Sequence, residues 1–210
     1  MTSVTIPNSV TSIGESAFSS CSGLKSVSIG SSVTSIKKSA FYGCSNLTSV
    51  IYHCKDIQSW FLNDTLSSIT KVKEIIIGDE VETIGQNAFF HYENLSTVIF
   101  SNSVTTIGAG AFASCTALTN ISLPNSITSI GSFAFANCKA LSSVNIPESL
   151  TVINESVFDG CFSLPKVTIP NSVTIIDKSA FSYCIIPDTG NRVRDGDACQ
   201  TATVLEYIKH

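Results

Sequence analysis

Cysteine is the residue type whose spacing in this chain first suggests chemistry. The 210 residues include eight cysteines, and most of them follow a phenylalanine by three positions. These cysteines, whose place Tyr92 takes once, are Cys21, Cys44, Cys115, Cys138, Cys161 and Cys184. An even count can form disulfides, and copies about 5 Å apart on adjacent turns would meet the geometry of a bridge. Because one repeated position serves one packing role, we predict buried free thiols; paired thiols in the native mass would contradict this.

Metal binding finds little support in the residue pattern. The cysteines lack the short C-x-x-C spacing and the neighbouring histidines of a zinc site. Asp188, Asp195 and Asp197 resemble a calcium loop only loosely, because the ordered ligand spacing and the final glutamate are missing. We therefore expect no metal and no cofactor.

His53, Cys54 and Asp56 together contain the groups of a Cys/His nucleophile with an orienting carboxylate. His53 and Cys54 are neighbours at the end of an expected strand, however, so their side chains should point to opposite faces. The sequence suggests neither an oxyanion donor nor the facing carboxylates that a glycosidase needs. We predict no catalytic residue and a chain that is not an enzyme.

The elements that position these residues come from a 23-residue repeat. A phenylalanine in an Ala-Phe or Val-Phe pair recurs at Phe18, Phe41, Phe89, Phe112, Phe135, Phe158 and Phe181. Each unit also contains the spacing L-x-x-V-x-I, whose alternation predicts a short strand, and apolar residues in the return that point inward, such as Val10, Ile13, Ala17, Phe18 and Cys21. A fixed period of this length is typical of a solenoid, in which the strands stack into a parallel sheet.

The phrases IPNSVTSIGESAF, LPNSITSIGSFAF and IPNSVTIIDKSAF, with a cysteine three residues after most phenylalanines, resemble the BspA-like (Treponema pallidum type) leucine-rich repeats. The resemblance covers residues 1–184. It implies a leucine-rich-repeat solenoid of stacked 23-residue units, with a parallel β-sheet on the concave face and short loop or helical returns. It also implies a cell-surface or secreted bacterial protein, Bacteroides-like, that acts as an adhesin toward host matrix or plasma proteins.

The repeat pattern divides the chain into a domain of eight units over residues 1–184 and a non-repeat segment over residues 185–210. The third unit, residues 47–71, is irregular and 25 residues long. It contains Trp60, Phe61 and Leu62, which we interpret as a longer, more helical return, with an exposed docking patch as the alternative. The last segment, ending in VLEYIKH, could cap the final apolar layer or stay disordered, which would make Cys199 the most reactive thiol.

One strand position suggests a binding surface. The residue between the two inward positions should face outward, and it reads Thr5, Ser28, Ile51, Ile76, Ile99, Ser122, Asn145 and Thr168. Stacked strands would join the three isoleucines into an apolar stripe on a polar concave sheet, as at many partner sites. The expected rim is Ser49, His53, Glu74, Gly78, Thr97 and Ser101. The alternative is that β-branched residues here only suit a strand.

Composition limits the classes of partner. The net charge of -4 and the scattered 12 Lys and Arg residues give no basic surface for nucleic acid. No stretch approaches the roughly 18–20 apolar residues of a membrane-spanning helix, and no basic region and apolar core precede the first strand. We therefore expect a fragment of a longer protein that binds protein, or glycan through its Ser, Thr and Asn side chains. A rigid spacer that presents another domain is the alternative.

Overall fold

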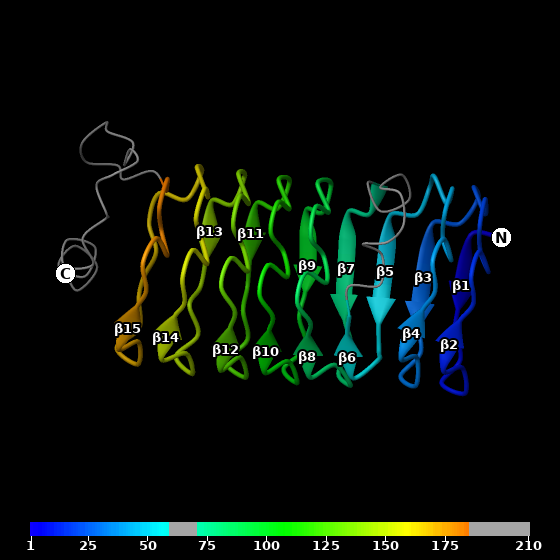
Figure 1. Cartoon of the computed structure of the whole chain (residues 1–210), viewed down its shortest axis with the longest axis horizontal. Helices are drawn as coiled ribbons and strands as arrows, with labels where there is room; N and C mark the ends of the chain where they lie inside the picture. Colours follow the sequence, from blue (N-terminus) through cyan, green and yellow to red (C-terminus); the bar gives the residue numbers. More distant parts are fainter. Residues whose placement is uncertain (59–70, 185–210) are drawn as a thin grey trace.

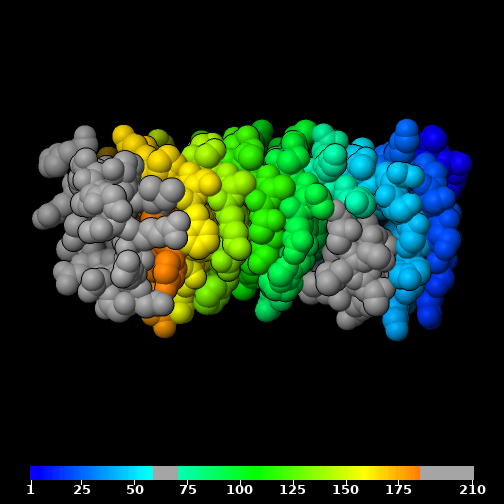
Figure 2. Space-filling view, turned by 90° about the horizontal axis from the view of Figure 1, so that it is seen from above, coloured from blue at the N-terminus to red at the C-terminus, as the bar shows by residue number. Residues whose placement is uncertain are grey.

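The computed structural model describes residues 1–58 and 71–184, which form one elongated solenoid (Figure 1). Strands of odd number from β1 to β13 follow one side of the solenoid, and short strands of the returns follow another. From above, the turns succeed one another in sequence order from end to end (Figure 2). Each turn therefore packs mainly on its two neighbours, as in other repeat proteins.

The longer strands form the main sheet, which confirms the predicted stack of parallel strands. Its order is β1-β3-β5-β7-β9, and every adjacent pair is parallel. The strands are β1 (Ser3–Thr5), β3 (Ser26–Ile29), β5 (Ser49–Tyr52), β7 (Glu74–Ile77) and β9 (Thr97–Ile99). In β3, β5 and β7 the first and third residues are half-buried and the second and fourth are buried, so the L-x-x-V-x-I spacing does place its apolar residues inward.

The main sheet does not continue in the same form through the later turns. There the corresponding strands are β11 (Asn120–Ile121) and β13 (Ser143–Val144), which pair only with each other. Residues 166–168, at the same place in the next turn, form no strand. The repeat is therefore uniform in sequence but not in its main-chain pairing.

The returns contain a second set of strands that the sequence analysis did not predict. Each is two residues long: β2 (Ser12–Ile13), β4 (Ser35–Ile36), β6 (Asp56–Ile57), β8 (Thr83–Ile84), β10 (Thr106–Ile107), β12 (Ser129–Ile130), β14 (Val152–Ile153) and β15 (Ile175–Ile176). Strands β12-β10-β8-β6 form one sheet, and β2-β4 and β14-β15 form two pairs. The isoleucine that ends each strand packs in or against the core. The residue before it points away from the core and is serine or threonine in five of the eight strands.

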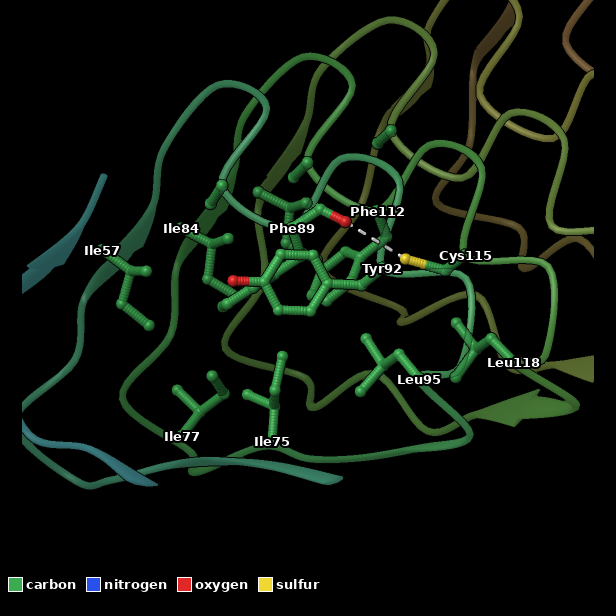
Figure 3. Close-up of a cluster of buried hydrophobic side chains, with 14 of the residues drawn as sticks. Ile57, Ile75, Ile77, Ile84, Phe89, Tyr92, Leu95, Phe112, Cys115 and Leu118 are labelled. Carbon is green, nitrogen blue, oxygen red and sulfur yellow. Dashed lines mark hydrogen bonds between the residues drawn. The ribbon is translucent and has the colours of Figure 1, made fainter. Parts of the chain in front are cut away.

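The core is one continuous column of equivalent side chains. In the turn after β9 the buried set is Val104, Ile107, Ala111, Phe112, Cys115 and Leu118. Figure 3 shows how Phe89, Phe112 and Tyr92 fill the space between the two strand layers. The first turn is an exception to the predicted inward return, because Ala17 is exposed and Val10, Phe18 and Cys21 are only partly buried.

Two positions of every described return have a positive φ. The first reads Ser16, Ser39, Asn87, Gly110, Phe133, Ser156 and Ser179, and the second Ser20, Gly43, His91, Ser114, Asn137, Gly160 and Tyr183. Between them the phenylalanine N–H donates to the next turn, as from Phe89 to Ala111 at 2.7 Å and from Phe112 to Ala134 at 2.8 Å. Glycine adopts this conformation without strain, whereas the Cβ of any other L-residue costs about 1–2 kcal/mol there.

Candidate functional site

The three outward isoleucines occupy one row across neighbouring strands of the main sheet. The pairing register places Ser28 beside Ile51, Ile51 beside Ile76, and Ile76 beside Ile99. Ile51 and Ile76 are half-buried, and Ile99 is 48% exposed. We call Ile51, Ile76 and Ile99 the isoleucine stripe. The structure thus brings together the residues that the spacing predicted, although their role in binding stays a prediction.

The main chain of the stripe is hydrogen-bonded to the neighbouring turns. Beyond the strand ends, His53 N–H donates to Ile29 O at 2.9 Å and Gly78 N–H donates to Tyr52 O at 2.8 Å. These hydrogen bonds continue the ladder for one more residue on the strands that carry Ile51 and Ile76. Because the backbone of the row is paired within the sheet, the stripe offers side chains and no free ladder edge to a partner.

Polar residues border the stripe where the strands begin. Ser49, Glu74 and Thr97 form the adjacent row, and the Ser49 hydroxyl donates to Glu74 Oε2 at 2.9 Å. Glu74 is half-buried and Thr97 is exposed. The hydrogen bond therefore holds a carboxylate in a defined position directly beside Ile76.

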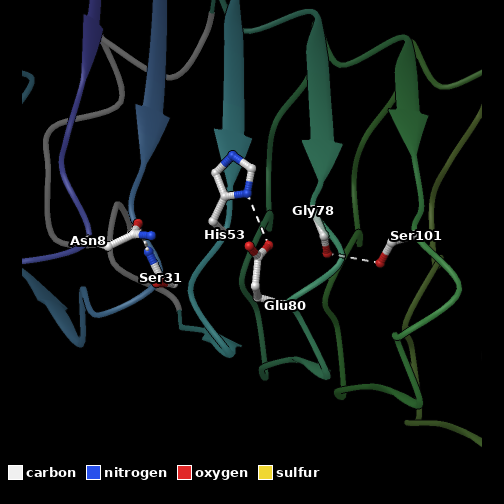
Figure 4. A network of polar contacts seen from close by, with 6 residues as sticks. All are labelled: Asn8, Ser31, His53, Gly78, Glu80 and Ser101. Carbon is white, nitrogen blue, oxygen red and sulfur yellow. Dashed lines mark hydrogen bonds and ion pairs between the residues drawn. The ribbon is translucent and has the colours of Figure 1, made fainter.

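The opposite border, where the strands end, contains a hydrogen bond between an imidazole and a carboxylate (Figure 4). His53 Nδ1 lies 3.1 Å from Glu80 Oε2, and the imidazole is the donor because a carboxylate only accepts. This hydrogen bond lowers the pKa of the Glu80 carboxyl. A Cβ on Gly78 would lie 2.7 Å from His53 Nδ1, so glycine is required for the ring to lie across this turn.

The predicted rim needs one correction and one addition. Ser101 is buried, and its hydroxyl donates to Gly78 O at 2.9 Å, so this side chain supports the turn and does not face a partner. Glu80, which the sequence analysis missed, lies beside His53 in the loop after β7. Its only sequence signal was an acidic residue two positions after Gly78, in a loop whose path depends on the tertiary fold.

Cys54 does not form a nucleophile with His53. Its thiol is buried and lies three residues before Ile57, as Val33 does before Ile36 and Val81 before Ile84. Burial raises the pKa of Cys54 to about 12, so the thiol is protonated at neutral pH. The imidazole meanwhile contacts Glu80 on the outer surface, which confirms that the two side chains point to opposite faces.

The repeated cysteines are free thiols, and all but the half-buried Cys21 are buried. From Cys44 onward each Sγ–H of this set donates to the carbonyl of a phenylalanine in the preceding turn, with Sγ–O distances between 3.1 and 3.4 Å. Figure 3 shows this contact between Cys115 and Phe89. The predicted packing role is confirmed, and these thiols are unsuited to nucleophilic chemistry because burial raises the pKa values of Cys115, Cys138 and Cys161.

Several predicted features lie outside the described residues. They are the Trp60, Phe61 and Leu62 patch, the possible cap in residues 185–210, Cys199 and the aspartates from Asp188 to Asp197. The division into eight units and a C-terminal segment stays a prediction for the same reason.

Three further features of the described part concern metal ligands, membrane-crossing helices and an exposed aromatic side chain. Within residues 1–58 and 71–184, no three His, Cys, Asp or Glu side chains gather in a way that could hold a metal ion. The same ranges contain no helix of the length and apolarity that crossing a bilayer requires. Outside the stripe, Phe133 is a large apolar side chain in a left-handed conformation and is 45% exposed.

Comparison with known proteins identifies the same repeat family that the sequence pattern resembles. A family model described as BspA type leucine rich repeat region, in six copies, matches residues 1–70 and 61–186. The leucine-rich repeat protein TpLRR of T. pallidum is a solved structure with 28% sequence identity and a TM-score of 0.56, and the match covers 83% of this chain and 72% of that one. No curated protein matches.

A leucine-rich repeat protein from Bacteroides ovatus ATCC 8483 is similar to the same degree. Its identity is again 28% and its TM-score 0.56, over 83% of this chain but only 41% of that chain. These structures have the repeat in common with the present chain, and the second extends well beyond the matched part.

Proposed function

This chain belongs to the BspA-type leucine-rich repeat family, and from that premise we propose that it is a non-enzymatic protein-binding module whose main sheet carries the binding site. Leucine-rich repeats are protein-interaction scaffolds as a class, and a solenoid offers an extended surface for this purpose. The observation that carries the proposal is the register of Ile51, Ile76 and Ile99, which aligns three outward apolar side chains on adjacent strands.

The surroundings of the stripe support this role. Half-exposed apolar side chains lie at the centre, and Glu74, His53 and Glu80 lie at the border. An apolar centre with a polar rim is the usual anatomy of a protein interface. In the same outward row Thr5 and Thr168 are exposed polar residues, so the apolar character is confined to the middle strands.

We propose further that the protein acts at the cell surface or after secretion, as an adhesin toward host matrix or plasma proteins. This part rests on family resemblance. No residue of the stripe identifies the partner. Glycan is a second ligand class, because Ser, Thr and Asn side chains cover much of the remaining sheet face.

The test is biolayer interferometry of the purified chain against fibrinogen, fibronectin and a glycan panel. The informative variant is Ile76→Lys, which places a charge in the centre of the stripe. The matched control is Thr168→Lys, which makes the same change in charge in the same outward row but far from the stripe. We expect saturable binding that falls at least tenfold in Ile76→Lys and is unchanged in Thr168→Lys.

Binding that both variants retain would contradict a site on the stripe. Far-UV circular dichroism and thermal unfolding must show that Ile76→Lys is folded, which we expect because Ile76 is only half-buried. If the wild-type chain binds nothing in the panel, the result favours a second candidate function, a rigid spacer that presents another domain. The continuous core and the pairing between successive turns are the features that favour such a spacer.

A further inference from the structure

We propose that the partner segment on the isoleucine stripe is an α-helix that lies along the solenoid axis, with basic residues on the flank that faces Asp79 and Glu80. This inference rests on the proposed function and specifies the chemistry of the partner at the same site. It follows from the repeat distance of the stripe and from the distribution of charge beside it.

The repeat distance selects a helix over an extended segment. Ile51, Ile76 and Ile99 lie on adjacent paired strands, which are about 4.8 Å apart. One face of a helix presents a residue every three or four positions, or about 5.3 Å of axis on average. The difference from the strand spacing accumulates to only about 1 Å between Ile51 and Ile99.

An extended segment in the same direction matches poorly. Its side chains on one face recur about every 6.7 Å, so it would lose register by about 4 Å over the same three isoleucines. That is the full contact distance between two carbon atoms. A segment lying across the strands also cannot add to the sheet, because the N–H and C=O groups of the row are engaged in the ladder.

The residues at the two ends of the stripe allow a helix to continue beyond it. Ser28 precedes Ile51 in the row and Ser122 occupies the equivalent position after Ile99. Both side chains are small, so a rigid rod about 10 Å wide can pass over them without a clash. A bulky residue at either place would have limited the partner to a single turn.

Charge complementarity gives the orientation of the helix about its own axis. Where the strands begin, Glu74 is next to the exposed Lys73, so the two formal charges offset each other. Where the strands end, Asp79 and Glu80 are exposed, and only the imidazole of His53 contacts Glu80. Glu82 lies farther along the loop and pairs with Lys55 at 3.1 Å. The uncompensated negative charge is therefore at the strand ends, where Lys or Arg of the partner would lie.

The experiment uses synthetic peptides as probes and fluorescence anisotropy on the full chain. The first peptide is a hydrocarbon-stapled helix of about three turns, with leucines at i, i+3, i+4 and i+7 and lysines along one flank. A second peptide has the same composition but alternates leucine and polar residues, as a strand does. A third is the stapled helix with glutamates in place of the lysines.

We expect the lysine helix to bind saturably and both other peptides to bind at least tenfold more weakly. Ile76→Ser should weaken the lysine helix at least tenfold, and Glu80→Gln about threefold with a smaller dependence on salt. Thr168→Ser, in the same row but outside the stripe, should change nothing. Equal or tighter binding of the alternating or the glutamate peptide, no effect of Ile76→Ser, or no peptide binding at all would each overturn the proposal.

The outcomes separate this inference from the proposed function. If a protein of the panel binds through Ile76 but no helical peptide does, the protein-binding function stands and the helical partner is wrong. If the lysine helix binds through Ile76 and competes with a panel protein, both proposals are supported. If neither the panel nor any peptide binds, both fail.

Discussion

Strands β5 and β7 are four residues long, whereas β11 and β13, at the same positions of later turns, have only two residues each. The reason lies at the position that follows the second inward residue of the unit, such as Tyr52, Ile77, Leu123 or Ile146. His53 and Gly78 donate their N–H groups to the preceding turn at that place. The later turns carry Pro124, Pro147 and Pro170 there, and proline has no N–H to donate.

In the turns of β11 and β13 a side chain takes over the missing main-chain contact. The Asn145 Nδ2–H₂ group donates to Leu123 O at 2.7 Å, and Asn145 Oδ1 accepts from Leu123 N–H at 2.7 Å. Leu123 O is the acceptor that an N–H at Pro147 would reach in the pattern of His53 and Ile29. The outward residue of this turn thus serves the fold, whereas among the described residues the apolar side chains of Ile51, Ile76 and Ile99 form no hydrogen bond to a neighbouring turn.

The largest expected effect is alkaline unfolding, to which buried thiols of both regions contribute. Ionised thiolates are solvated in the unfolded chain but not in the core, so burial raises the native pKa of Cys54, Cys115, Cys138 and Cys161 above the ordinary value of 9.0. The stability is therefore intact below about pH 9 and falls above it, by about 1.4 kcal/mol per pH unit for each such thiol up to its native pKa.

Alkylation followed by mass spectrometry measures this effect for each cysteine. At pH 8 we expect the half-buried Cys21 to react with iodoacetamide and the buried Cys115, Cys138 and Cys161 to resist. Between pH 9 and 12 the buried thiols should become reactive together as the chain unfolds. Rapid labelling of Cys138 at pH 8 in the native protein would contradict the buried column.

Truncation of a stacked phenylalanine should have the next largest effect. The Phe135 ring stacks on Phe112 at 5.4 Å and on Phe158 at 5.5 Å and is fully buried. Among the described residues, the half-buried Phe18 stacks only on Phe41, at 5.1 Å. Phe135→Ala should cost about 3–5 kcal/mol in urea denaturation, because it leaves a cavity in the core. Phe18→Ala should cost clearly less, and equal losses would argue against the additive picture of stacked turns.

Asn145→Ala should cost about 1–3 kcal/mol, since it leaves both polar groups of Leu123 without the side-chain amide. The matched control is Asn125→Ala, an exposed asparagine in the preceding turn, for which we expect less than about 0.5 kcal/mol. Pro147→Ser would restore an N–H at the position where β5 and β7 have one. If Asn145→Ala costs less free energy of unfolding in the Pro147→Ser background than in the wild-type chain, the Asn145 amide and a main-chain N–H are interchangeable. Equal costs in the two backgrounds would contradict this.

The smallest effect is expected at Phe133, and its sign is the opposite. Phe133 has φ 61° where Gly110 occupies the same place in the preceding turn with φ 62°. Because Phe133 is 45% exposed and its backbone is left-handed, Phe133→Gly should stabilise the chain by up to about 1 kcal/mol in thermal or urea unfolding. A clear destabilisation would mean that the ring supports the return by packing.

The sequence predicted the inward columns because they follow a strict 23-residue period. It also placed Ile51, Ile76 and Ile99 in one row, since residues at equal positions of stacked turns must be neighbours. It did not predict the two-residue strands of the returns, because one outward residue followed by one isoleucine is too short a pattern to distinguish a strand from a turn. Nor did it find Glu80, whose contact with His53 joins two turns through exposed loops.

The irregular unit shows the same limit. In the sequence, His53 and Cys54 interrupt the repeat. In the structure, the segment between Tyr52 and Ile57 is two residues shorter than the equivalent segment between Ile29 and Ile36. This deletion moves Cys54 into the place that valine holds in neighbouring turns, where it is buried. Cys54, for which the sequence analysis predicted no catalytic role, is thus a core residue.

The repeat pattern was enough to establish the solenoid, its period, its core columns and the order of residues along each outward row. These properties depend only on which positions alternate and recur, and stacking identical units satisfies all of them at once. The three-dimensional structure was needed to show which of the described outward residues are hydrogen-bonded to another turn. Asn145 is engaged with Leu123 and Ser101 with Gly78, while the isoleucine stripe is not, because a hydrogen bond between turns depends on atomic distances that the period leaves unspecified.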